Sequence, residues 1–512
     1  LAPLERDLGQ AWWEGATAAS PEVDARRADL DRRRRALLAE PALLAEVTAA
    51  GGDPGVAGDP LLARSLTVLR NLVLPQQVDA GIRDALVERE TAVDARFTAY
   101  RAELDGVAVG DNEIAAILRT SDDSGERRAA WEASKQVGRA VADDVRALAR
   151  LRNAAARSLG FRDHFALACA VSELDEDRLL ATLAEVDRLT RAPFTTWKAV
   201  LDDRLATRFG VVTADLCPWH LDDPFFQDPP VAGTVDLDPL FADVDPVEAA
   251  RRTFAALGLD PDPILAVSDL YARAGKSQHA FCIHVDREGD VRVLANVEPN
   301  ERWADTMLHE MGHAVYDRAL DPALPWLLRE PAHACVTEGI AMLFGRLARD
   351  PEWLTGVAGV PAARVAALAP ALHDARRASL LVFVRWVLLV THFERRLYAD
   401  PDGDLDSVWW DLVERFQLVR RPAGRDAPDW AAKIHLAVVP VYYQNYLYGE
   451  MFASLVAATA RERFGGLAGR PEVGRYLRDA VFAPGAVRRW DALVLEATGT
   501  EFGAVGLAAD LT

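Results

Sequence analysis

The stretch from Leu308 to Val315 constrains this chain more than any other, because it reads Leu-His-Glu-Met-Gly-His-Ala-Val. It contains the pattern His309-Glu310-x-x-His313. Residues four positions apart on a helix lie nearly above one another, so His309 and His313 could bind one metal ion through their imidazole rings. Glu310 would lie about a quarter-turn away, where a metallohydrolase needs the general base that acts on the metal's water. The pattern therefore predicts a helix that carries part of a metal site.

The sequence around this pattern is typical of a helix. Asn300 is a suitable N-cap after Pro299, and Asp321-Pro322 ends the run. An apolar stripe connects the two ends and is formed by Trp303, Met307, Leu308, Met311 and Val315. We therefore expect one helix between Asn300 and Asp321. A coincidental match of so short a pattern is the alternative, and this context argues against it.

A third ligand is available in Glu338, which follows His313 by 25 positions in a second helical pattern that begins at Pro331. Two helices that cross at the metal would supply two histidines and one carboxylate. They would leave a fourth position open, as in catalytic zinc sites. Asp317 is a rival ligand on the first helix, but it is eight residues, or about 12 Å, from His309. We therefore expect one zinc ion, although these ligand types alone do not separate zinc from manganese or cobalt.

Composition limits the partners of the chain. The 512 residues carry a formal net charge of −20, which argues against nucleic acid or an anionic membrane as a partner. The most apolar stretch, Ala378 to Val390, contains Arg385 and is predicted to be a core helix and not a membrane span. The four cysteines are widely spaced, so we expect reduced thiols in a cytoplasmic protein with no obligatory protein partner. No charged-then-apolar segment opens the chain at Leu1, and a removed leader stays open as an alternative.

Helical patterns dominate the chain, almost without interruption from Leu4 to about Arg208, so we expect a mainly α fold. The convincing strands, Phe281 to Asp286 and Val291 to Val297, flank a glycine-containing turn and predict a β-hairpin before the metal helix. An extended peptide could pair with the edge of this hairpin. Sequence rich in proline and aspartate, from Cys217 to Pro246, predicts an irregular connection. We divide the chain into an N-terminal helical half, a connecting segment, a catalytic core and C-terminal helices, which form one integrated unit and comprise residues 1–216, 217–265, 266–465 and 466–512.

Two blocks of sequence resemble known zinc peptidases. The first comprises Gln278-His279-Ala280-Phe281-Cys282, the His-Glu-Met-Gly-His pattern, Leu327-Leu328-Arg329-Glu330 and Thr337-Glu338-Gly339-Ile340. The second comprises Ala432-Lys433-Ile434-His435 and the tyrosine-rich segment from Pro440 to Glu450. Together they resemble the angiotensin-converting enzyme family of peptidyl dipeptidases and the related thimet oligopeptidase family. The resemblance implies a mainly helical, ellipsoidal peptidase with a deep central cleft that admits short, flexible peptides.

The resemblance also implies the roles of the residues that act on the scissile bond. His309, His313 and Glu338 would bind zinc, while Glu310 would deprotonate the water and later carry the proton to the leaving amine. Tyr446 matches the tyrosine whose hydroxyl stabilises the oxyanion of the tetrahedral intermediate, a task that suits a neutral phenol. The alternative is that Tyr446 is one aromatic residue in a core helix.

Further residues would bind the substrate on either side of that bond. His279 and His435 resemble donors to substrate carbonyl groups, and Ala280 lies next to the first of them. Either histidine could instead be an ordinary core residue. Lys433 looks like the lysine that binds the C-terminal carboxylate of the substrate. Its alternative is a surface lysine whose stem covers apolar neighbours.

Three features depart from the dipeptidase pattern. The interval from His435 to Tyr446 is one residue longer, so either Tyr442 or Tyr443 would accompany the lysine at the carboxylate. Asn445 occupies the place of an arginine linked to chloride activation. Met342 stands where the dipeptidases have a carboxylate that orients a zinc ligand, so the sequence names no partner for the ligand histidines.

The function expected from these observations is zinc-dependent hydrolysis of peptide bonds in short peptides, with release of C-terminal dipeptides. An oligopeptidase that cuts internally is one alternative. Another is a specialised amide hydrolase or maturation enzyme that acts on a modified peptide or a small molecule. A silent peptide-binding protein is disfavoured, because a binder needs neither the base Glu310 nor the oxyanion donor Tyr446.

Overall fold

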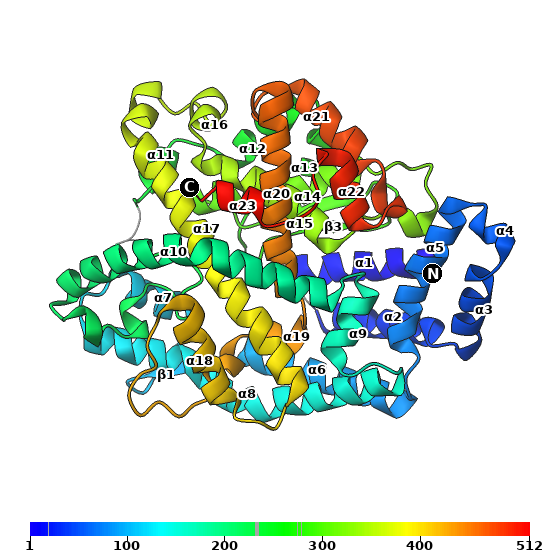
Figure 1. Cartoon of the computed structure of the whole chain (residues 1–512), viewed down its shortest axis with the longest axis horizontal. Helices are drawn as coiled ribbons and strands as arrows, with labels where there is room; N and C mark the ends of the chain where they lie inside the picture. Colours follow the sequence, from blue (N-terminus) through cyan, green and yellow to red (C-terminus); the bar gives the residue numbers. More distant parts are fainter. Residues whose placement is uncertain (19, 231–234, 274, 278, 512) are drawn as a thin grey trace. The chain divides into compact units, whose positions relative to one another are not determined.

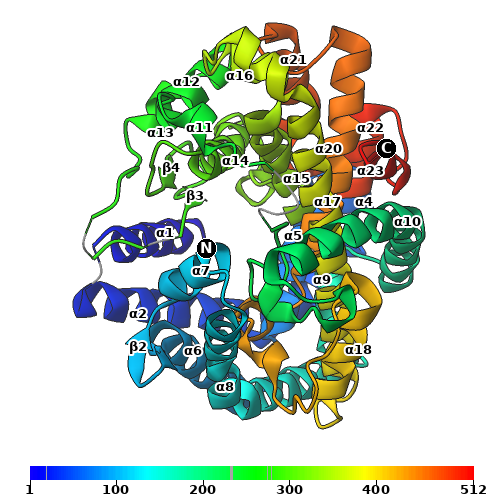
Figure 2. The same cartoon turned by 90° about the vertical axis from the view of Figure 1, so that its left-hand side faces the viewer.

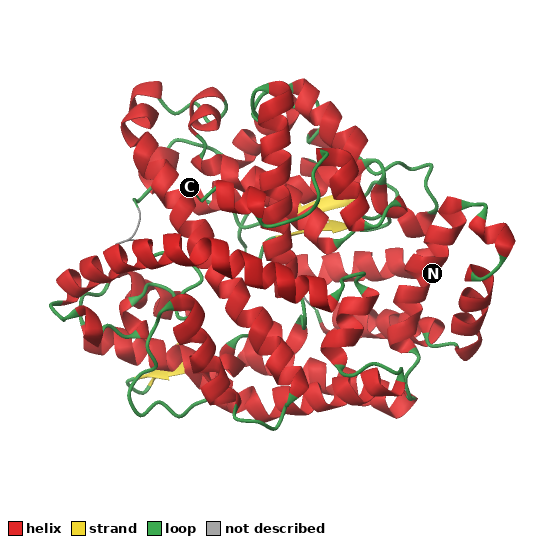
Figure 3. Cartoon of the chain, in the orientation of Figure 1, coloured by secondary structure: helices red, strands yellow, loops and turns green. Residues whose placement is uncertain are grey.

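The computed structural model describes residues 1–18, 20–230, 235–273, 275–277 and 279–511. Helices make up most of these residues, and the strands among them form two small antiparallel sheets (Figure 3). β1 (Ala102–Leu104) pairs with β2 (Val107–Val109), and β3 (Phe281–His284) pairs with β4 (Val291–Leu294). The prediction of a mainly α fold with a hairpin before the helix that carries His309 and His313 is confirmed. In the described part of the chain, no helix has the length and apolar character needed to cross a membrane.

The β1–β2 hairpin corrects the prediction of an almost uninterrupted helical pattern from Leu4 to Arg208. Its turn is Asp105-Gly106, and both residues have positive φ angles, 51° and 79°. An Asp-Gly dipeptide favours a two-residue hairpin turn of this kind. The flanking strands have three residues each, too few to produce a recognisable alternation of apolar and polar positions. The Asp-Gly dipeptide of the turn was therefore the only local sequence feature that indicated this hairpin.

The chain folds into two compact units, each assembled from stretches far apart in the sequence. Unit 1 comprises Leu1–Gln77, Asp236–Leu372 and Tyr448–Leu507, and unit 2 comprises Val78–Val235, His373–Leu447 and Ala508–Thr512. The ranges 1–216, 217–265, 266–465 and 466–512 cut across both units. The chain passes from one unit to the other within the expected irregular connection, and again within α17 (Ala362–Ala399), α20 (Tyr443–Phe464) and α23 (Val505–Ala509).

Proline and side-chain caps define the first helices of unit 1. Four consecutive helices begin at a proline, which suits the first turn because its missing N–H needs no partner there. Ser20 and Asp59 cap two of them by accepting hydrogen bonds from backbone N–H groups. The other helices of this unit include the pair that forms the candidate site (Figure 1). The unit contains α1 (Ala2–Thr17), α2 (Pro21–Leu38), α3 (Pro41–Gly51), α4 (Pro54–Ala57), α5 (Pro60–Val73), α11 (Asp238–Phe241), α12 (Pro246–Ala256), α13 (Asp262–Leu265), α14 (Glu301–Arg318), α15 (Ala334–Gly345), α16 (Pro351–Gly356), α21 (Pro471–Leu477) and α22 (Trp490–Thr498).

Unit 2 is built around long helices. Asp123 caps the first of these, α8 (Ser124–Ser158), and Gly160 follows its end with a φ of 86°, which a glycine adopts readily after a helix. The remaining helices of the unit are α6 (Ala80–Ala99), α7 (Asp111–Thr120), α9 (His164–Val171), α10 (Glu176–Phe209), α18 (Leu405–Gln417) and α19 (His435–Val438). Short helical turns connect elements in both units: η1 (Leu74–Gln76), η2 (Thr213–Asp215), η3 (Pro218–His220), η5 (Trp326–Leu328), η6 (Arg346–Arg349), η7 (Asp429–Ala432), η8 (Arg478–Phe482) and η9 (Gly485–Val487).

The apolar stretch from Ala378 to Val390 lies inside α17 and is a core helix, as predicted. Its aliphatic side chains are almost completely buried. Arg385 is also buried, and it donates hydrogen bonds to the carboxylate of Asp187 and the hydroxyl of Thr190. A buried guanidinium needs such partners because desolvation is costly. The charge within the stretch is therefore a paired core charge.

Candidate metal centre

The candidate centre is formed by α14 and α15, which pack against each other beside the β3–β4 hairpin (Figure 2). Asn300 caps α14, as predicted, because its side chain accepts a hydrogen bond of 2.9 Å from the N–H of Trp303. The ring of His333 caps α15 by accepting a hydrogen bond of 3.0 Å from the N–H of Cys335. The predicted second helix therefore begins three residues later than Pro331.

Gly312 allows the two helices to approach closely. A Cβ atom at this position would lie 2.9 Å from the Cα of Ala341 on α15, a contact that would displace backbone. The residue therefore acts through its missing side chain, as at other close helix crossings. His313 follows Gly312 directly. The close crossing therefore brings the two histidines of α14 near Glu338 of α15.

The predicted ligands converge at this crossing. Nε2 of His309 lies 3.7 Å from Oε2 of Glu338, and Nε2 of His313 lies 3.9 Å from the same oxygen. One donor atom from each of the three residues lies within 4.8 Å of the other two. No other group of three histidine, cysteine or acidic donors in the described ranges is this close. The three residues proposed as ligands from the sequence therefore lie close together in the fold.

The donor set fits a zinc ion by its chemistry and spacing. Zinc binds imidazole nitrogen and carboxylate oxygen at about 2.0–2.2 Å, which leaves neighbouring ligand atoms somewhat more than 3 Å apart. The observed separations exceed that value only slightly, so small side-chain rotations would bring the three atoms to one ion. Three protein ligands leave a position for water or substrate, the arrangement of a catalytic site.

Glu310 lies beside these residues but does not belong to the ligand set. Its side chain is buried, and burial is the main cause that raises its pKa to about 7. His309 lowers this pKa, Glu338 raises it, and a hydrogen bond from the backbone of Cys282 lowers it again. The β3 strand thus holds the carboxyl group that the sequence analysis assigned as the general base.

The partner of His313 is Thr337, which sequence reasoning did not identify. Nδ1 of His313 and Oγ1 of Thr337 are 2.6 Å apart, a hydrogen bond that leaves Nε2 directed toward Glu338. Burial, with a contribution from His309, lowers the pKa of His313 well below its ordinary value, so the ring is neutral. A neutral imidazole fixed through its second nitrogen is suited to bind a metal. The signal in the sequence was the position of Thr337, directly before Glu338.

Among the described residues, β3 pairs with no strand other than β4, so its outer edge next to this centre has no strand partner, although the N–H of Cys282 donates to Glu310. The N–H of Val285 bonds to the carbonyl of Asp290, so the alternation of the ladder directs the backbone groups of Cys282 and His284 away from β4. The opposite edge is already covered, because Val293 bonds to Ser268 and Asp269. The edge predicted to receive a peptide is therefore the outer edge of β3.

A pocket of about 360 Å³ opens along this edge of β3. It lies entirely within unit 1, between the hairpin, the last turn of α14 and the start of α15. It is therefore next to the candidate ligands, since Thr337 forms part of its wall. Its lining residues are Cys282, Ile283, His284, Arg287, Asp317, Glu330, Pro331, His333, Ala334 and Thr337.

The remaining predicted residues are divided between the two units. His279 is exposed and Ala280 is half-buried, and both directly precede β3 in unit 1. Gln278, which opens the same motif, lies outside the described residues. The second block lies in unit 2. That block contains Lys433, His435, Tyr442, Tyr443 and Tyr446.

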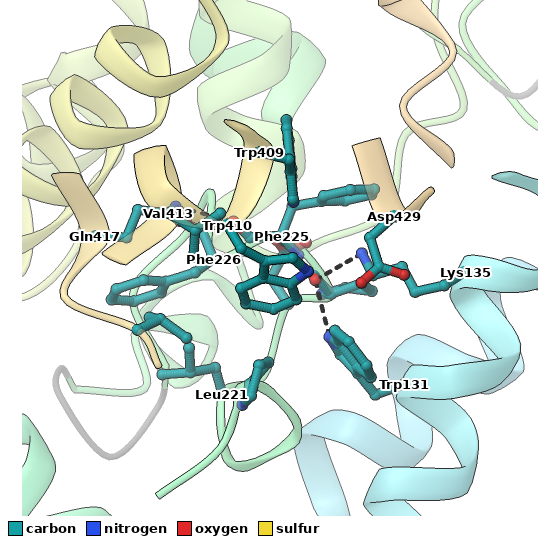
Figure 4. Close-up of a pocket in the computed structure, with 14 residues that line it drawn as sticks. Trp131, Lys135, Leu221, Phe225, Phe226, Trp409, Trp410, Val413, Gln417 and Asp429 are labelled. Atoms are coloured by element: carbon teal, nitrogen blue, oxygen red, sulfur yellow. Dashed lines mark hydrogen bonds between the residues drawn. The ribbon is translucent and has the colours of Figure 1, made fainter. Parts of the chain in front are cut away.

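Lys433 lies in an aromatic environment of unit 2. Its Nζ donates a hydrogen bond of 2.6 Å to Oε1 of Gln227 and lies 5.7 Å from the centre of the Phe225 ring. Burial lowers its pKa to about 8. Lys135 lies 3.1 Å from the centre of the same ring and donates a hydrogen bond to the carbonyl of Pro224 (Figure 4). The lysine is thus a partly buried cation, and not a surface lysine in water.

The tyrosines of the second block form a cluster. The rings of Tyr442 and Tyr443 lie 5.2 and 5.5 Å from the ring of Tyr446, and His435 lies 5.1 Å from Tyr443. Tyr443 is buried, whereas Tyr442 and Tyr446 are half-buried. The cluster leads directly into α20, which continues into unit 1.

α20 also contacts the metal-ligand helix within unit 1. A Cβ at Gly449 would lie 3.1 Å from the Cβ of Glu338, so α15 and α20 approach as closely as α14 and α15 do. Tyr446 precedes Gly449 by three residues on the same helix, and such residues share one helical face. Gly449 is the residue of α20 that meets Glu338 within unit 1.

Comparison with known proteins adds no family assignment. No model of a known protein family matches the chain, and no curated protein matches it in sequence. The resemblance to the zinc peptidases rests on the two motif blocks described above.

Proposed function

We propose that this protein is a zinc-dependent peptidase that hydrolyses short peptides. The observation that carries the proposal is the convergence of His309, His313 and Glu338 beside the buried Glu310. A binding protein would have no use for a buried carboxylate next to three metal donors. Desolvation makes such a group costly, which favours a chemical role for it.

His309, His313 and Glu338 would hold the ion. When bound, zinc would supply Lewis-acid chemistry that polarises the scissile carbonyl and makes water more acidic. Glu310 takes a proton from the attacking water and later delivers it to the leaving amine. Burial and the N–H of Cys282 keep its carboxylate in one position during both transfers.

Two further groups act on the substrate in this proposal. The outer edge of β3 binds an extended peptide through backbone hydrogen bonds, which hold the scissile bond near Glu310. The hydroxyl of Tyr446 donates a hydrogen bond to the oxyanion that forms during attack. The support for this role is the match of Tyr446 to the zinc-peptidase motif and its half-buried side chain.

We further propose that the enzyme releases dipeptides from free C-termini. Lys433 is the group that would bind the C-terminal carboxylate, together with Tyr442 or Tyr443. Its support is the partly buried ammonium group among aromatic rings, where an anion would be a favourable partner. His279 and His435 would donate to substrate carbonyls near the bond.

The test is digestion of a mixed peptide library by zinc-loaded protein, with the products sized by mass spectrometry. We expect dipeptides from free C-termini. Products of internal cleavage would show that the enzyme is an oligopeptidase and does not release dipeptides. Absence of any cleavage would favour an enzyme that acts on a modified peptide or a small molecule. Glu310→Gln should lower turnover by roughly 10²–10⁴-fold while zinc stays bound. Unchanged turnover would show that Glu310 is not the base.

A further inference from the structure

The pocket along β3 contains a charge that the proposed reaction does not use. Asp317 lies on the last turn of α14, one turn beyond His313, and faces this pocket. In the described part of the chain, no hydrogen bond or ion pair satisfies its carboxylate. A carboxylate in this position, too far from His309 to bind the metal, needs another explanation.

The other charged groups of the pocket do not neutralise it. Arg287 pairs with Glu330, and its guanidinium stacks at 4.2 Å from the centre of the Trp326 ring. Burial lowers the pKa of His284 to about 4, so this ring is neutral near pH 7. Arg287 acts on Asp317 only through space, since its ion pair is with Glu330, and burial raises the pKa of Asp317 to about 7. Asp317 is therefore a carboxyl group that makes no ion pair with any described residue.

Apolar side chains form part of the wall of this pocket, and Cys282, His333 and Thr337 complete it. Ile283, Pro331 and Ala334 line the pocket together with it. Such a wall is suited to cover the methylene stem of a long side chain whose charged end reaches the carboxylate. A second metal ion is a poor alternative, because no further set of three close donors exists among the described residues.

We propose that this pocket is a specificity site for a cationic substrate residue, lysine or arginine, whose charged end pairs with Asp317. The inference rests on the proposed peptidase function and names the substrates that the same site prefers. A peptide held along the outer edge of β3 would direct alternate side chains toward the pocket. An ammonium or guanidinium group there would form a charge-assisted hydrogen bond with little competition from water.

The test compares short peptides that differ at one position, with lysine, arginine, norleucine or glutamate at each position in turn. Norleucine keeps the stem of lysine without its charge. We expect one position at which kcat/KM for lysine or arginine exceeds that for norleucine by about 10–100-fold. Asp317→Asn should remove this preference and leave cleavage of the norleucine peptide nearly unchanged.

Glu288→Gln is the matched control. It removes an exposed carboxylate from the turn of the same hairpin, outside the pocket, and should keep the preference. Absence of a cationic preference at every position, or its survival in Asp317→Asn, would overturn the inference while leaving peptide cleavage intact. If no peptide is cleaved, the proposed function fails. The pocket is still tested by the affinity of Glu310→Gln protein for the lysine and norleucine peptides, measured by fluorescence anisotropy, and equal affinities would overturn the inference.

Discussion

The ring of His313 and the hydroxyl of Thr337 form a hydrogen bond of 2.6 Å between α14 and α15. Thr337 directly precedes Glu338, so one helix supplies both the third candidate ligand and the group that orients the second. Met342 has no polar group that could form such a bond, so the described partner of His313 is the Thr337 hydroxyl. Because this bond joins the two helices, the orientation of the His313 ring depends on how α14 packs against α15.

Loss of that hydroxyl should weaken metal binding. Thr337→Val keeps the shape of the side chain but removes the partner of Nδ1, and such partners typically contribute about 10–100-fold to metal affinity. The dissociation constant for zinc can be measured by competition with a chromophoric chelator. Thr337→Ser keeps the hydroxyl and should retain most of the affinity. Equal affinities for the valine and serine variants would contradict the role of the bond.

The close approach at Gly312 should be intolerant of a methyl group. Gly312→Ala would press Cβ against the backbone of Ala341, and we expect a loss of roughly 1–3 kcal/mol in stability together with weaker zinc binding. Thermal unfolding with and without zinc measures both effects. Gly51→Ala is the control, because nothing lies within 4 Å of a Cβ there. A Gly312→Ala variant as stable as the control would show that the helices can separate without cost.

Binding of the substrate's C-terminal carboxylate should depend on Lys433. Lys433→Met removes the charge and keeps a stem of similar length, so kcat/KM for peptides with a free C-terminus should fall by about 10–100-fold. The same peptides with an amidated C-terminus provide the control, since they carry no carboxylate to bind. An equal loss for both substrate forms would assign Lys433 a structural role instead.

Stability should depend on pH through Glu394 in unit 2. Burial raises the pKa of this carboxyl group from 4.5 to about 8, although the N–H of Val441 and the charge of Arg152 oppose the shift. The folded protein therefore keeps a proton that the unfolded chain releases. The stabilisation from this proton is fully present below pH 4.5 and is lost as the pH rises to about 8.

Glu394→Gln cannot ionise, so its Tm relative to the native protein should rise between pH 5 and pH 8. Thermal scans at several pH values measure this difference. Glu88→Gln changes an exposed carboxylate of the same unit and should leave the pH profile unchanged. A Glu394→Gln profile parallel to that of the native protein would show that the carboxyl group is ionised in the folded state.

Local sequence was sufficient for the elements that depend on near neighbours. The cap at Asn300, the helix end at Gly160 and the metal helix itself follow from short-range spacing and side-chain hydrogen bonds. The approach of Glu338 could also be predicted, because two amphipathic helices and a known ligand chemistry restrict the possibilities. These features do not require knowledge of distant contacts.

Other features depend on how distant elements pack. Thr337 could not be chosen from its neighbours, because its contact with His313 exists only where the two helices cross. Asp317 was rejected as a metal ligand from its distance along the helix, and it does not belong to the group of three close donors, but its pocket is formed by residues of β3 and α15. The two units are assembled from interleaved stretches, and no composition change marks their limits at Gln77 or Leu372.

The most direct test of the account is the zinc content of the purified protein after dialysis against a weak chelator, measured by mass spectrometry of the metal. We predict about one zinc ion per chain, lost in His309→Ala and in Glu338→Ala and kept in the Glu288→Gln control. Equal zinc content in the native protein and the Glu338→Ala variant, or no bound metal in the native protein, would contradict the claim that α14 and α15 together hold a catalytic ion.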